Sequence, residues 1–324
     1  MPDDRSTDEA VPGPRAAALA APDAAGEGRG RGVAYALATY VSWGFLPLFF
    51  RLLRPLPPAY VVAHRVIWAS LLFAALCALT GRLGGLRAAV GRPRTLAALA
   101  LSAVLIAVNW LLYVYAVSSG RVLEASLGYF INPLLNVALG VAVLGERLER
   151  RSWLAIGLAA AGVLVLSVGR TGGVPWLSLG LALSFGLYGL VRKRLELDTL
   201  TASTLEALLL APFGLAYALL VGAGAAPPPS HGVPLWALLL ASGALTAVPL
   251  YWFASAARLL PLSQLGFFQY ISPSLQFLLA VLAFGETFTA RHAWGFGCIW
   301  AALALSSLVA YRRAPGGARP ALSR

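Results

Sequence analysis

The sequence predicts an all-α integral membrane protein with ten transmembrane helices, arranged as two inverted repeats of five helices. The chain of 324 residues is 59% hydrophobic and only 12% charged, with a mean hydropathy of +0.76. Soluble domains are nearer one quarter charged. Ten apolar stretches are each long enough to cross a bilayer core of about 30 Å. Features of the first five stretches recur in the second five, which indicates a repeat.

The ten stretches leave little room for a soluble domain. We expect the first repeat over residues 33–169 and the second over 175–311, with a disordered N-terminal tail over 1–32 and a further tail over 312–324. The N-terminal tail has only a short apolar run, too brief for a signal-peptide core, so the first span is expected to act as an uncleaved signal anchor. The predicted spans are 33–52, 60–80, 95–117, 122–144, 152–169, 175–193, 201–222, 234–257, 262–284 and 292–311.

The net charge of +12 comes from arginines in the short loops and tails rather than from a basic surface for nucleic acid. If the N-terminus is cytoplasmic, most of the basic residues fall in cytoplasmic segments. Among them are four arginines between the second and third spans and the group at Arg192 after the sixth. The positive-inside rule therefore predicts that both termini lie in the cytoplasm. We expect no nucleic-acid partner.

An offset of 140–142 residues aligns the two halves. In the fourth span, Tyr-Phe-Ile-Asn-Pro ends at Pro133 and is followed by Gly145-Glu146. In the ninth span, Gln-Tyr-Ile-Ser-Pro ends at Pro273 and is followed at the same spacing by Gly285-Glu286. Because each half has an odd number of spans, the repeats must be antiparallel and related by a pseudo-two-fold axis in the membrane plane.

The matched prolines mark a candidate site near the middle of the membrane. A proline inside a span removes a backbone donor and frees a carbonyl that a side chain, a neighbour or water must satisfy. Pro133 and Pro273 are therefore candidate hinges, although a plain kink that helps the bundle to pack is the alternative. The polar and aromatic neighbours are candidate substrate ligands: Tyr129, Asn132, Gln269, Tyr270 and Ser272.

Arg65 and Glu206 are the clearest ionisable residues within spans, where a charge is costly and so needs an explanation. They are equivalent under the repeat, but their backbones should lie about 15 Å apart in depth, which argues against direct pairing. Arg65 either snorkels to the outer interface or faces a cavity and attracts an anionic substrate, with His64 beside it. Glu206 is either a proton-coupling carboxylate or an interfacial helix-start residue. His64 alone is more typical of a hydrogen-bonded structural imidazole.

The remaining chemical groups predict no cofactor and no metal. Glu146 and Glu286 close the fourth and ninth spans and are expected to cap helices or to pair with loop arginines. Cys77 and Cys298 each lie in an apolar span, where they form no disulfide framework or metal-ligand spacing. The chain contains no nucleotide-binding loop of the Gly-Lys-Ser/Thr type.

Five segments of the chain resemble the EamA branch of the drug/metabolite transporter superfamily, and within it the RarD-type proteins. The likeness runs from about residue 32 to 312, and the long segment in the fourth span is the most specific. The resemblance implies ten helices in two EamA repeats, a plasma-membrane location and export of small metabolites or drugs. The segments that carry it are residues 64–68, 109–112, 124–134, 188–193 and 265–271.

By this resemblance, spans one, three, four, six, eight and nine surround a central cavity. That implication favours a pocket-lining role for Trp43, Asn109, Tyr129 and Tyr270. Other embedded aromatic residues either pack in the bundle or line the pocket. These further candidates are Trp110, Tyr188 and Tyr251.

We therefore expect a secondary transporter that alternates between its two repeats. It would be driven by the proton gradient or by the substrate's own gradient, with a small molecule and membrane lipid as its partners. An enzyme is disfavoured because the chain shows no Gly-x-Ser-x-Gly elbow, metal-ligand spacing or paired carboxylates. The alternatives are an intramembrane lipid-modifying enzyme and a non-transporting membrane assembly factor.

Overall fold

The computed structural model describes residues 14–144, 150–167, 175–222, 234–260 and 268–313. Within these ranges the chain forms eleven α-helices, one short π-helix and no strand, which confirms the prediction of an all-α protein. The helices are α1 (Pro14–Leu52), α2 (Pro58–Leu79), α3 (Leu83–Val90), α4 (Pro93–Ser118), α5 (Val122–Leu144), α6 (Arg150–Ser167), α7 (Trp176–Lys193), α8 (Thr199–Gly222), α9 (Leu235–Leu259), α11 (Ile271–Leu278), η1 (Leu279–Ala283) and α12 (Ala290–Arg313).

Proline and glycine fix several helix boundaries. Pro58 and Pro93 lie in the first turns of α2 and α4, where the missing N–H would have no helical partner in any case. Gly81, Gly120 and Gly285 follow α2, α4 and η1 with φ of 70°, 67° and 66°. This left-handed conformation favours glycine and terminates helices. The turns are thus encoded locally in the sequence.

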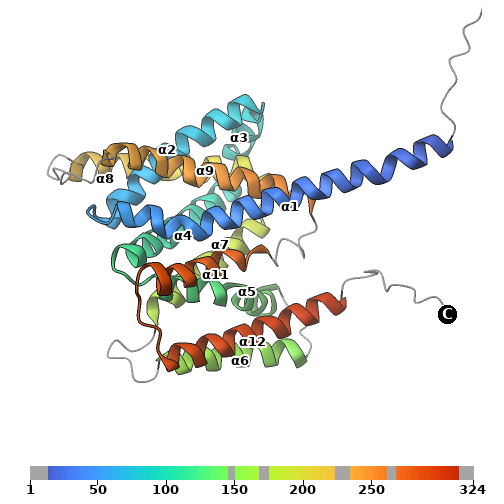
Figure 1. Cartoon of the computed structure of the whole chain (residues 1–324). Helices are drawn as coiled ribbons and strands as arrows, with labels where there is room; N and C mark the ends of the chain where they lie inside the picture. Colours follow the sequence, from blue (N-terminus) through green and yellow to red (C-terminus); the bar gives the residue numbers. More distant parts are fainter. Residues whose placement is uncertain (1–13, 145–149, 168–174, 223–233, 261–267, 314–324) are drawn as a thin grey trace, which may run out of the picture.

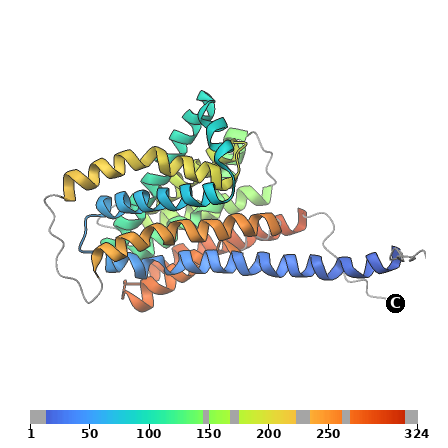
Figure 2. The same ribbon diagram turned by 90° about the horizontal axis from the view of Figure 1, so that it is seen from above.

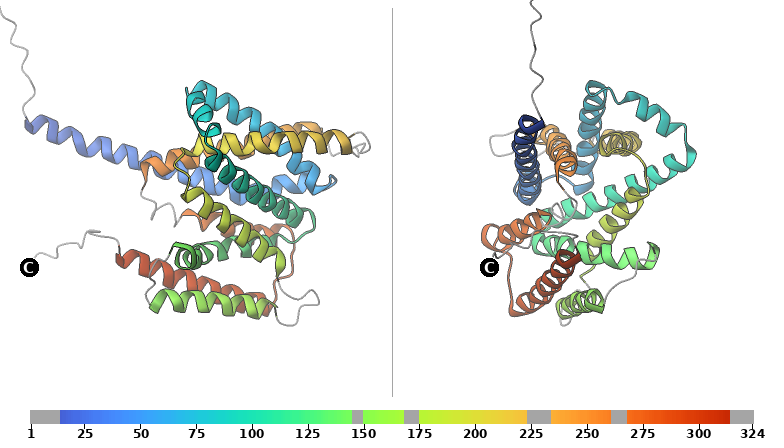
Figure 3. Two further views of the ribbon diagram at one scale, coloured as in Figure 1. Left: turned by 180° about the vertical axis from the view of Figure 1, so that it is seen from behind. Right: turned by 90° about the vertical axis from the view of Figure 1, so that its right-hand side faces the viewer.

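The helices form a bundle in which two outer groups flank a central one (Figure 1). In that view α6 and α12 lie side by side at the bottom, and α2, α8 and α9 lie together at the top. Between these groups, α5 contacts α7 and α11, α4 contacts α7 and α8, and α1 contacts α9 and α11. The views from behind and from the side show the same grouping (Figure 3).

One buried apolar core runs through the bundle. Its members come from α1, α2, α4, α5, α6, α7, α9, η1 and α12, and include Phe50, Val114, Phe130, Leu181 and Ile299. Because residues from both halves share this core, the halves pack as one body rather than as separate domains.

The packing of α6 on α12 depends on small residues. A Cβ atom built on Gly162 of α6 would lie 2.7 Å from the backbone oxygen of Gly295 of α12. Such close backbone approach between helices is typical of membrane proteins. The two helices correspond to the fifth and tenth predicted spans.

Two segments differ from the sequence prediction. α1 begins at Pro14, well before residue 33, so part of the predicted disordered tail is helical; its alanine-rich run has a high helix propensity. In Figure 2, α1 extends beyond the other helices. The arginine-containing loop predicted after the second span includes the short helix α3. The remainder of the two predicted tails lies outside the described residues.

The two candidate hinge prolines occupy different positions in their helices. Pro133 lies in the interior of α5. In contrast, α11 begins at Ile271, just before Pro273 and directly after a turn at Gln269 and Tyr270. Proline is tolerated in the first turn of a helix because its position needs no backbone donor. Pro273 therefore lies in the first turn of a helix, although the repeat predicts that both prolines lie inside a helix.

Five helices of the described chain are long and apolar enough to cross a membrane. Two shorter apolar helices, Trp153–Leu166 and Ile271–Ala283, lie within the predicted fifth and ninth spans. The five candidate spans are Gly28–Leu52, Pro58–Leu79, Pro93–Ser118, Thr199–Val221 and Leu235–Phe253.

Candidate functional site

Arg65 lies inside the bundle, with only 5% of its surface exposed. Its Nε donates a hydrogen bond to Oγ1 of Thr246 on α9, at 2.7 Å. Its guanidinium group lies 4.3 Å from the ring centroid of Trp110 on α4 and 5.4 Å from that of Phe50 on α1. Arginine over an aromatic face gains electrostatic attraction, most of all where water is excluded. Of the two alternatives for Arg65, this position corresponds to an inward-facing group rather than a snorkelling one.

Asn109 and Tyr129, two predicted substrate ligands, share a hydrogen-bond network that joins α4, α5 and α7. Nδ2 of Asn109 donates to the backbone oxygen of Leu181 at 3.0 Å and to Oγ of Ser184 at 3.1 Å. The Tyr129 hydroxyl donates to Oδ1 of Asn109 at 3.2 Å. The sequence alone places these residues on different spans, and the fold brings them together.

Glu206 is the centre of a second buried network. Its carboxylate accepts hydrogen bonds from Ser102 Oγ on α4 at 2.6 Å and from the Tyr188 hydroxyl on α7 at 3.3 Å. Arg192, in the last turn of α7, completes an ion pair at 3.3 Å. The predicted lack of direct pairing with Arg65 agrees with this arrangement, since each of the two charges has its own partners.

A column of aromatic rings connects these two networks. Tyr113 of α4 lies 6.0 Å from Phe50 and 5.8 Å from Tyr129, between ring centroids. Tyr129 lies 6.2 Å from Phe185, which in turn lies 5.9 Å from Tyr188. The rings therefore form a continuous path from the neighbourhood of Arg65 to the hydroxyl that binds Glu206.

Trp43 of α1 lies in a separate aromatic group. Its ring centroid is 5.5 Å from that of Tyr40 and 6.1 Å from that of Phe253 on α9. Its backbone oxygen accepts a hydrogen bond from Nε2 of Gln276 on α11, at 3.2 Å. Trp43 therefore links α1 to both α9 and α11.

Four of the predicted site residues lie around the start of α11, where their side chains are half-buried or buried. Gln269 and Tyr270 are half-buried in the turn, and Ser272 and Pro273 are buried in the first turn of the helix. Tyr270 packs against the main core.

Two predicted site residues lie apart from these networks. Tyr251 of α9 is 45% exposed, so its ring faces the outside of the bundle more than the interior. His64 is half-buried, and its ring lies 4.6 Å from that of Tyr60. Neither ring nitrogen of His64 has a hydrogen-bond partner within the described residues, contrary to the expected structural imidazole.

Several polar side-chain atoms are buried without a partner in the described part of the chain. The amide of Asn132, on α5, has neither its nitrogen nor its oxygen paired, although the residue is fully buried. The Tyr113 hydroxyl and Oε1 of Gln276 are also unpaired. Buried polar atoms are paired in the great majority of cases, so unpaired ones call for a ligand or water.

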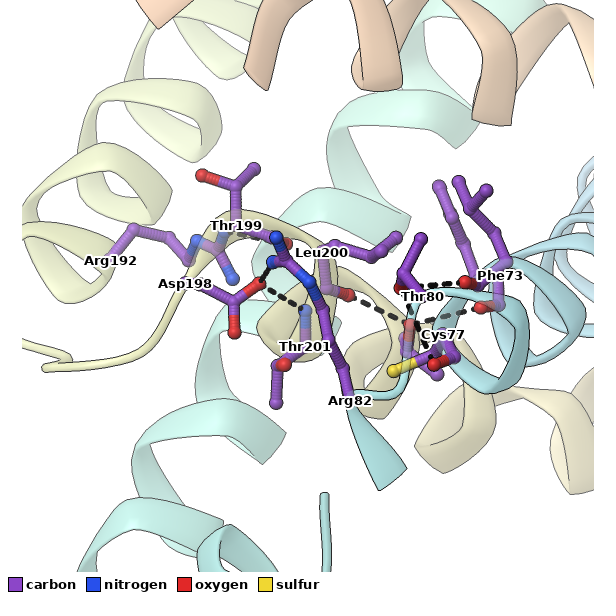
Figure 4. A network of polar contacts seen from close by, with 11 residues as sticks. Phe73, Cys77, Thr80, Arg82, Arg192, Asp198, Thr199, Leu200 and Thr201 are labelled. Carbon is purple, nitrogen blue, oxygen red and sulfur yellow. Dashed lines mark hydrogen bonds and ion pairs between the residues drawn. The ribbon is translucent and has the colours of Figure 1, made fainter. Parts of the chain in front are cut away.

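At the end of the bundle near α3, an ion pair links the two halves. Arg82, in the turn after α2, pairs with Asp198, in the loop between α7 and α8 (Figure 4). Asp198 also accepts a hydrogen bond from the backbone nitrogen of Thr201, at 3.1 Å, and so caps the start of α8. Burial tends to raise the pKa of Asp198, but the hydrogen bonds from Thr201 and the nearby Arg82 outweigh it and lower that pKa.

Sequence reasoning missed several residues of the site. Thr246, Ser102 and Ser184 are polar residues in apolar helices, a weak signal because such hydroxyls commonly bond their own backbone. Arg192 was counted only among the basic residues at the cytoplasmic end of the sixth span, and it lies in the last turn of α7. Its position four residues after Tyr188 puts both side chains on one helix face. This spacing could have indicated that Tyr188 and Arg192 share a partner, which is Glu206.

Among the described residues, no group of three or more metal-ligating side chains occurs. The side chains that do converge are hydroxyls, amides, aromatic rings, the guanidinium of Arg65 and the ion pair of Glu206 with Arg192. They can bind a polar or aromatic molecule through hydrogen bonds and ring stacking.

Comparison with known proteins gives a consistent result. The EamA-like transporter family matches residues 30–168 and again residues 173–308. The chain is 45% identical over 285 residues to "Protein RarD" of Streptomyces exfoliatus, covering 87% of this chain and 90% of that protein. It is 41% identical over 281 residues to an "Uncharacterized transporter" of Vibrio cholerae, covering 86% and 92%. A solved crystal structure matches the fold with a TM-score of 0.56 at 20% identity, covering 87% of this chain and 98% of that one.

Proposed function

Because the chain belongs to the EamA-like transporter family, we propose that it is a secondary transporter that exports small metabolites or drugs. Transport would proceed by alternating access between two inverted five-helix repeats around a central site. Family relatives are named as transporters, and the apolar helices are those of a multi-pass membrane protein.

The observation that carries this proposal is the set of unpaired polar atoms beside the hydrogen-bond network of Asn109 and Tyr129. Tyr113 lies four residues after Asn109 on α4, and Asn132 lies three residues after Tyr129 on α5, so each shares a helix face with a network member. An unpaired buried polar group costs roughly 1–3 kcal/mol. A polar substrate, or the water that replaces it, would remove this cost. The surrounding rings suit a flat or amphipathic molecule.

Equivalent contacts in the two halves support the inverted repeat. A Cβ atom on Gly44 of α1 would lie 2.6 Å from Leu275 of α11, and one on Gly186 of α7 would lie 3.0 Å from Leu135 of α5. Both pairs are related by the offset of 140–142 residues. Under this offset, the contacts of α1 with α9 and α11 correspond to those of α7 with α4 and α5.

A second pair of contacts supports the same relation. Thr39 Oγ1 donates to the backbone oxygen of Pro249 at 3.2 Å, linking α1 to α9. The equivalent positions in the other half are Leu181 and Asn109, where the Asn109 amide donates to the Leu181 oxygen. The donor and the acceptor have exchanged helices, but the bond joins corresponding points.

The grouping of loops supports ten crossings of the inner membrane, with both termini in the cytoplasm. The segments after α1, between α4 and α5, and between η1 and α12 line one cavity. The segments after α2 and after α7 meet in the pair of Arg82 and Asp198. These are the two sets of loops that a ten-span topology assigns to opposite sides, and the arginine-rich set is the cytoplasmic one.

Glu206 is the proposed coupling group. Its hydrogen-bond partners lie on α4 and α7, so a change in its charge acts on several helices at once. A proton on Glu206 would weaken its ion pair with Arg192 and favour separation of the two side chains. Transport driven by the substrate's own gradient is the alternative, which requires no such group.

Reconstituted flux measurements test these proposals. Purified protein in liposomes is assayed with a panel of small metabolites and drugs, with and without a pH gradient. We expect flux of at least one compound, loss of proton-driven flux but not exchange in Glu206→Gln, and unchanged flux in the control Glu196→Gln, an exposed loop carboxylate. Unchanged proton-driven flux in Glu206→Gln would reject the coupling role, and turnover of a lipid without any flux would favour an enzyme.

A further inference from the structure

A cavity of about 440 Å³ opens at the end of the bundle opposite the pair of Arg82 and Asp198. It is lined by the end of α1, the turn between α4 and α5, and the segment that links η1 to α12. Its volume lies within the range of small-molecule sites. None of the residues predicted from the sequence to bind substrate lines it.

The cavity wall carries an excess of positive charge. Its arginines are Arg51, Arg54 and Arg121, and its carboxylates are Glu124 and Glu286; His292 also contributes to the wall. The two carboxylates are engaged elsewhere in the wall. Both oxygens of Glu124 accept hydrogen bonds from Arg121, at 2.9 and 2.8 Å. The oxygens of Glu286 accept from the backbone nitrogens of Val122 and Leu123, at 2.6 and 2.8 Å.

This arrangement leaves the charges of Arg51 and Arg54 without a carboxylate. Arg51 donates a long hydrogen bond to the backbone oxygen of Ala283 at 3.4 Å, and its guanidinium lies 4.6 Å from the Phe284 ring centroid. Neither contact neutralises its charge. The side chain of Arg54 makes no hydrogen bond or ion pair within the described residues, and it is exposed. Guanidinium groups bind carboxylates and phosphates through two parallel hydrogen bonds.

We propose that this cavity is a second binding site, which takes the carboxylate or phosphate group of a small organic anion. Arg51 and Arg54 hold the anionic group, and the apolar wall of Val117, Leu123 and Phe284 holds the organic part. The proposal rests on the proposed function in one respect, because it gives the cavity the role of a waiting site at the outer mouth of the transport pathway.

Thiol labelling tests the site without any transport measurement. Thr287 is exposed on the cavity wall, and Thr287→Cys provides a reporter. Pro234, exposed at the start of α9, lies in a stretch without Asp, Glu, Lys or Arg from residue 207 to 257, so Pro234→Cys is a neutral control. The unmodified chain, with its own Cys77 and Cys298, measures background labelling. Each protein is purified at full length in phosphatidylcholine nanodiscs.

The measured quantity is the ratio of labelling rates with an anionic and a cationic methanethiosulfonate reagent. We expect this ratio to be at least about threefold higher at residue 287 than at residue 234, because positive potential concentrates anions. Arg51→Gln together with Arg54→Gln should return it to the control value. Inorganic phosphate or benzoate should slow labelling at residue 287 and leave residue 234 unchanged.

Three outcomes would overturn the proposal. The first is a ratio that does not respond to the two arginine substitutions, and the second is an absence of protection by both added anions. The third is slowing only when phosphatidylglycerol is added to the nanodisc, which would assign the site to a lipid headgroup instead. Because labelling needs no flux, a failure of the proposed transport activity would be seen separately, in the liposome assay.

Discussion

A buried guanidinium is stable only where neighbours replace its hydration, and Arg65 finds such neighbours on three other helices. Its Nε donates a hydrogen bond to Thr246, and the same guanidinium group lies over the ring of Trp110. Lysine would retain the charge but not the planar face or the fixed donor geometry. The position therefore depends on arginine rather than on positive charge alone.

A double-mutant cycle measures the bond between Arg65 and Thr246. We expect Arg65→Gln and Thr246→Val each to lower the free energy of unfolding in detergent. Their coupling energy should be roughly 0.5–1.7 kcal/mol, the size that double-mutant cycles give for hydrogen bonds between membrane helices. Thr246→Ser retains the hydroxyl and should leave the stability close to that of the unmodified chain. A coupling energy near zero would show that Arg65 is held by its aromatic contacts instead.

The contacts of Asp198 predict that this residue stabilises the folded protein by an amount that depends on pH. Its pKa is lower than usual in the folded chain because hydrogen bonds from Thr201 and the pair with Arg82 outweigh the effect of burial. A carboxyl group with a lowered folded pKa stabilises the fold above its unfolded pKa, and this contribution is lost as pH falls through the folded pKa.

Thermal unfolding of Asp198→Asn should therefore show a deficit of roughly 0.2–1 kcal/mol near neutral pH, typical of an exposed pair. The deficit should shrink as the pH falls below about 4. Glu196→Gln, in the same loop, serves as the control and should show no such trend. A deficit that stayed constant down to the lowest pH would mean that the charge of Asp198 does not contribute.

Among the helices, close packing depends on glycines at the contacts between α1 and α11 and between α7 and α5. Gly44 is the tighter case, since an added Cβ would meet both the Cβ and the Cδ1 of Leu275, at 2.7 and 2.6 Å. The Cβ of Leu275 cannot rotate away, so a methyl group would force the helices apart.

Gly44→Ala should destabilise the protein by roughly 1–3 kcal/mol, the usual cost of overpacking. Gly157 of α6 is the matched control, because an added Cβ meets nothing within 4 Å. Gly157→Ala should be neutral or stabilising by up to about 1 kcal/mol, since alanine favours helix. Melting temperatures in the same detergent compare the two. Equal effects of both substitutions would show that the contact between α1 and α11 is not tightly packed.

In the whole molecule, the two halves meet at both ends of the bundle. Glu286 of the second half caps the start of α5 in the first, and Arg82 of the first half pairs with Asp198 of the second. Alternating access requires the halves to separate at one end while they remain in contact at the other. The pair of Arg82 and Asp198 lies at the end that we propose to be cytoplasmic, the inner end. It is partly exposed and therefore weak enough to break in each cycle of the proposed transport.

Linking the inner ends should therefore stop transport. Arg82→Cys and Asp198→Cys are combined and joined by a reducible thiol-reactive spacer, and flux is measured in liposomes for a compound identified in the panel. We expect a loss of about tenfold or more after linking, because closure becomes permanent at that end, and recovery after reduction. The single-cysteine variants treated with the same reagent should retain their flux. A linked protein with full flux would mean that the inner ends do not separate.

The sequence by itself determined the helices and most of their boundaries. Apolar runs of membrane length and the glycines and prolines between them act locally, so each predicted span overlaps one of the helices described above. The family was also evident from the sequence, in short specific segments such as residues 124–134. The residue at which α11 begins was not evident from the sequence, because proline permits both an interior kink and a first-turn position.

Only the tertiary structure decided which polar side chains meet. Thr246 lies 181 residues from Arg65, and Ser102 lies 104 residues from Glu206. No local pattern specifies such pairs, because the rotation and depth of each helix are set by packing against its neighbours. The cavity that Arg51 and Arg54 line has the same origin, since its wall comes from three turns that are remote in the chain and adjacent only after the bundle has assembled.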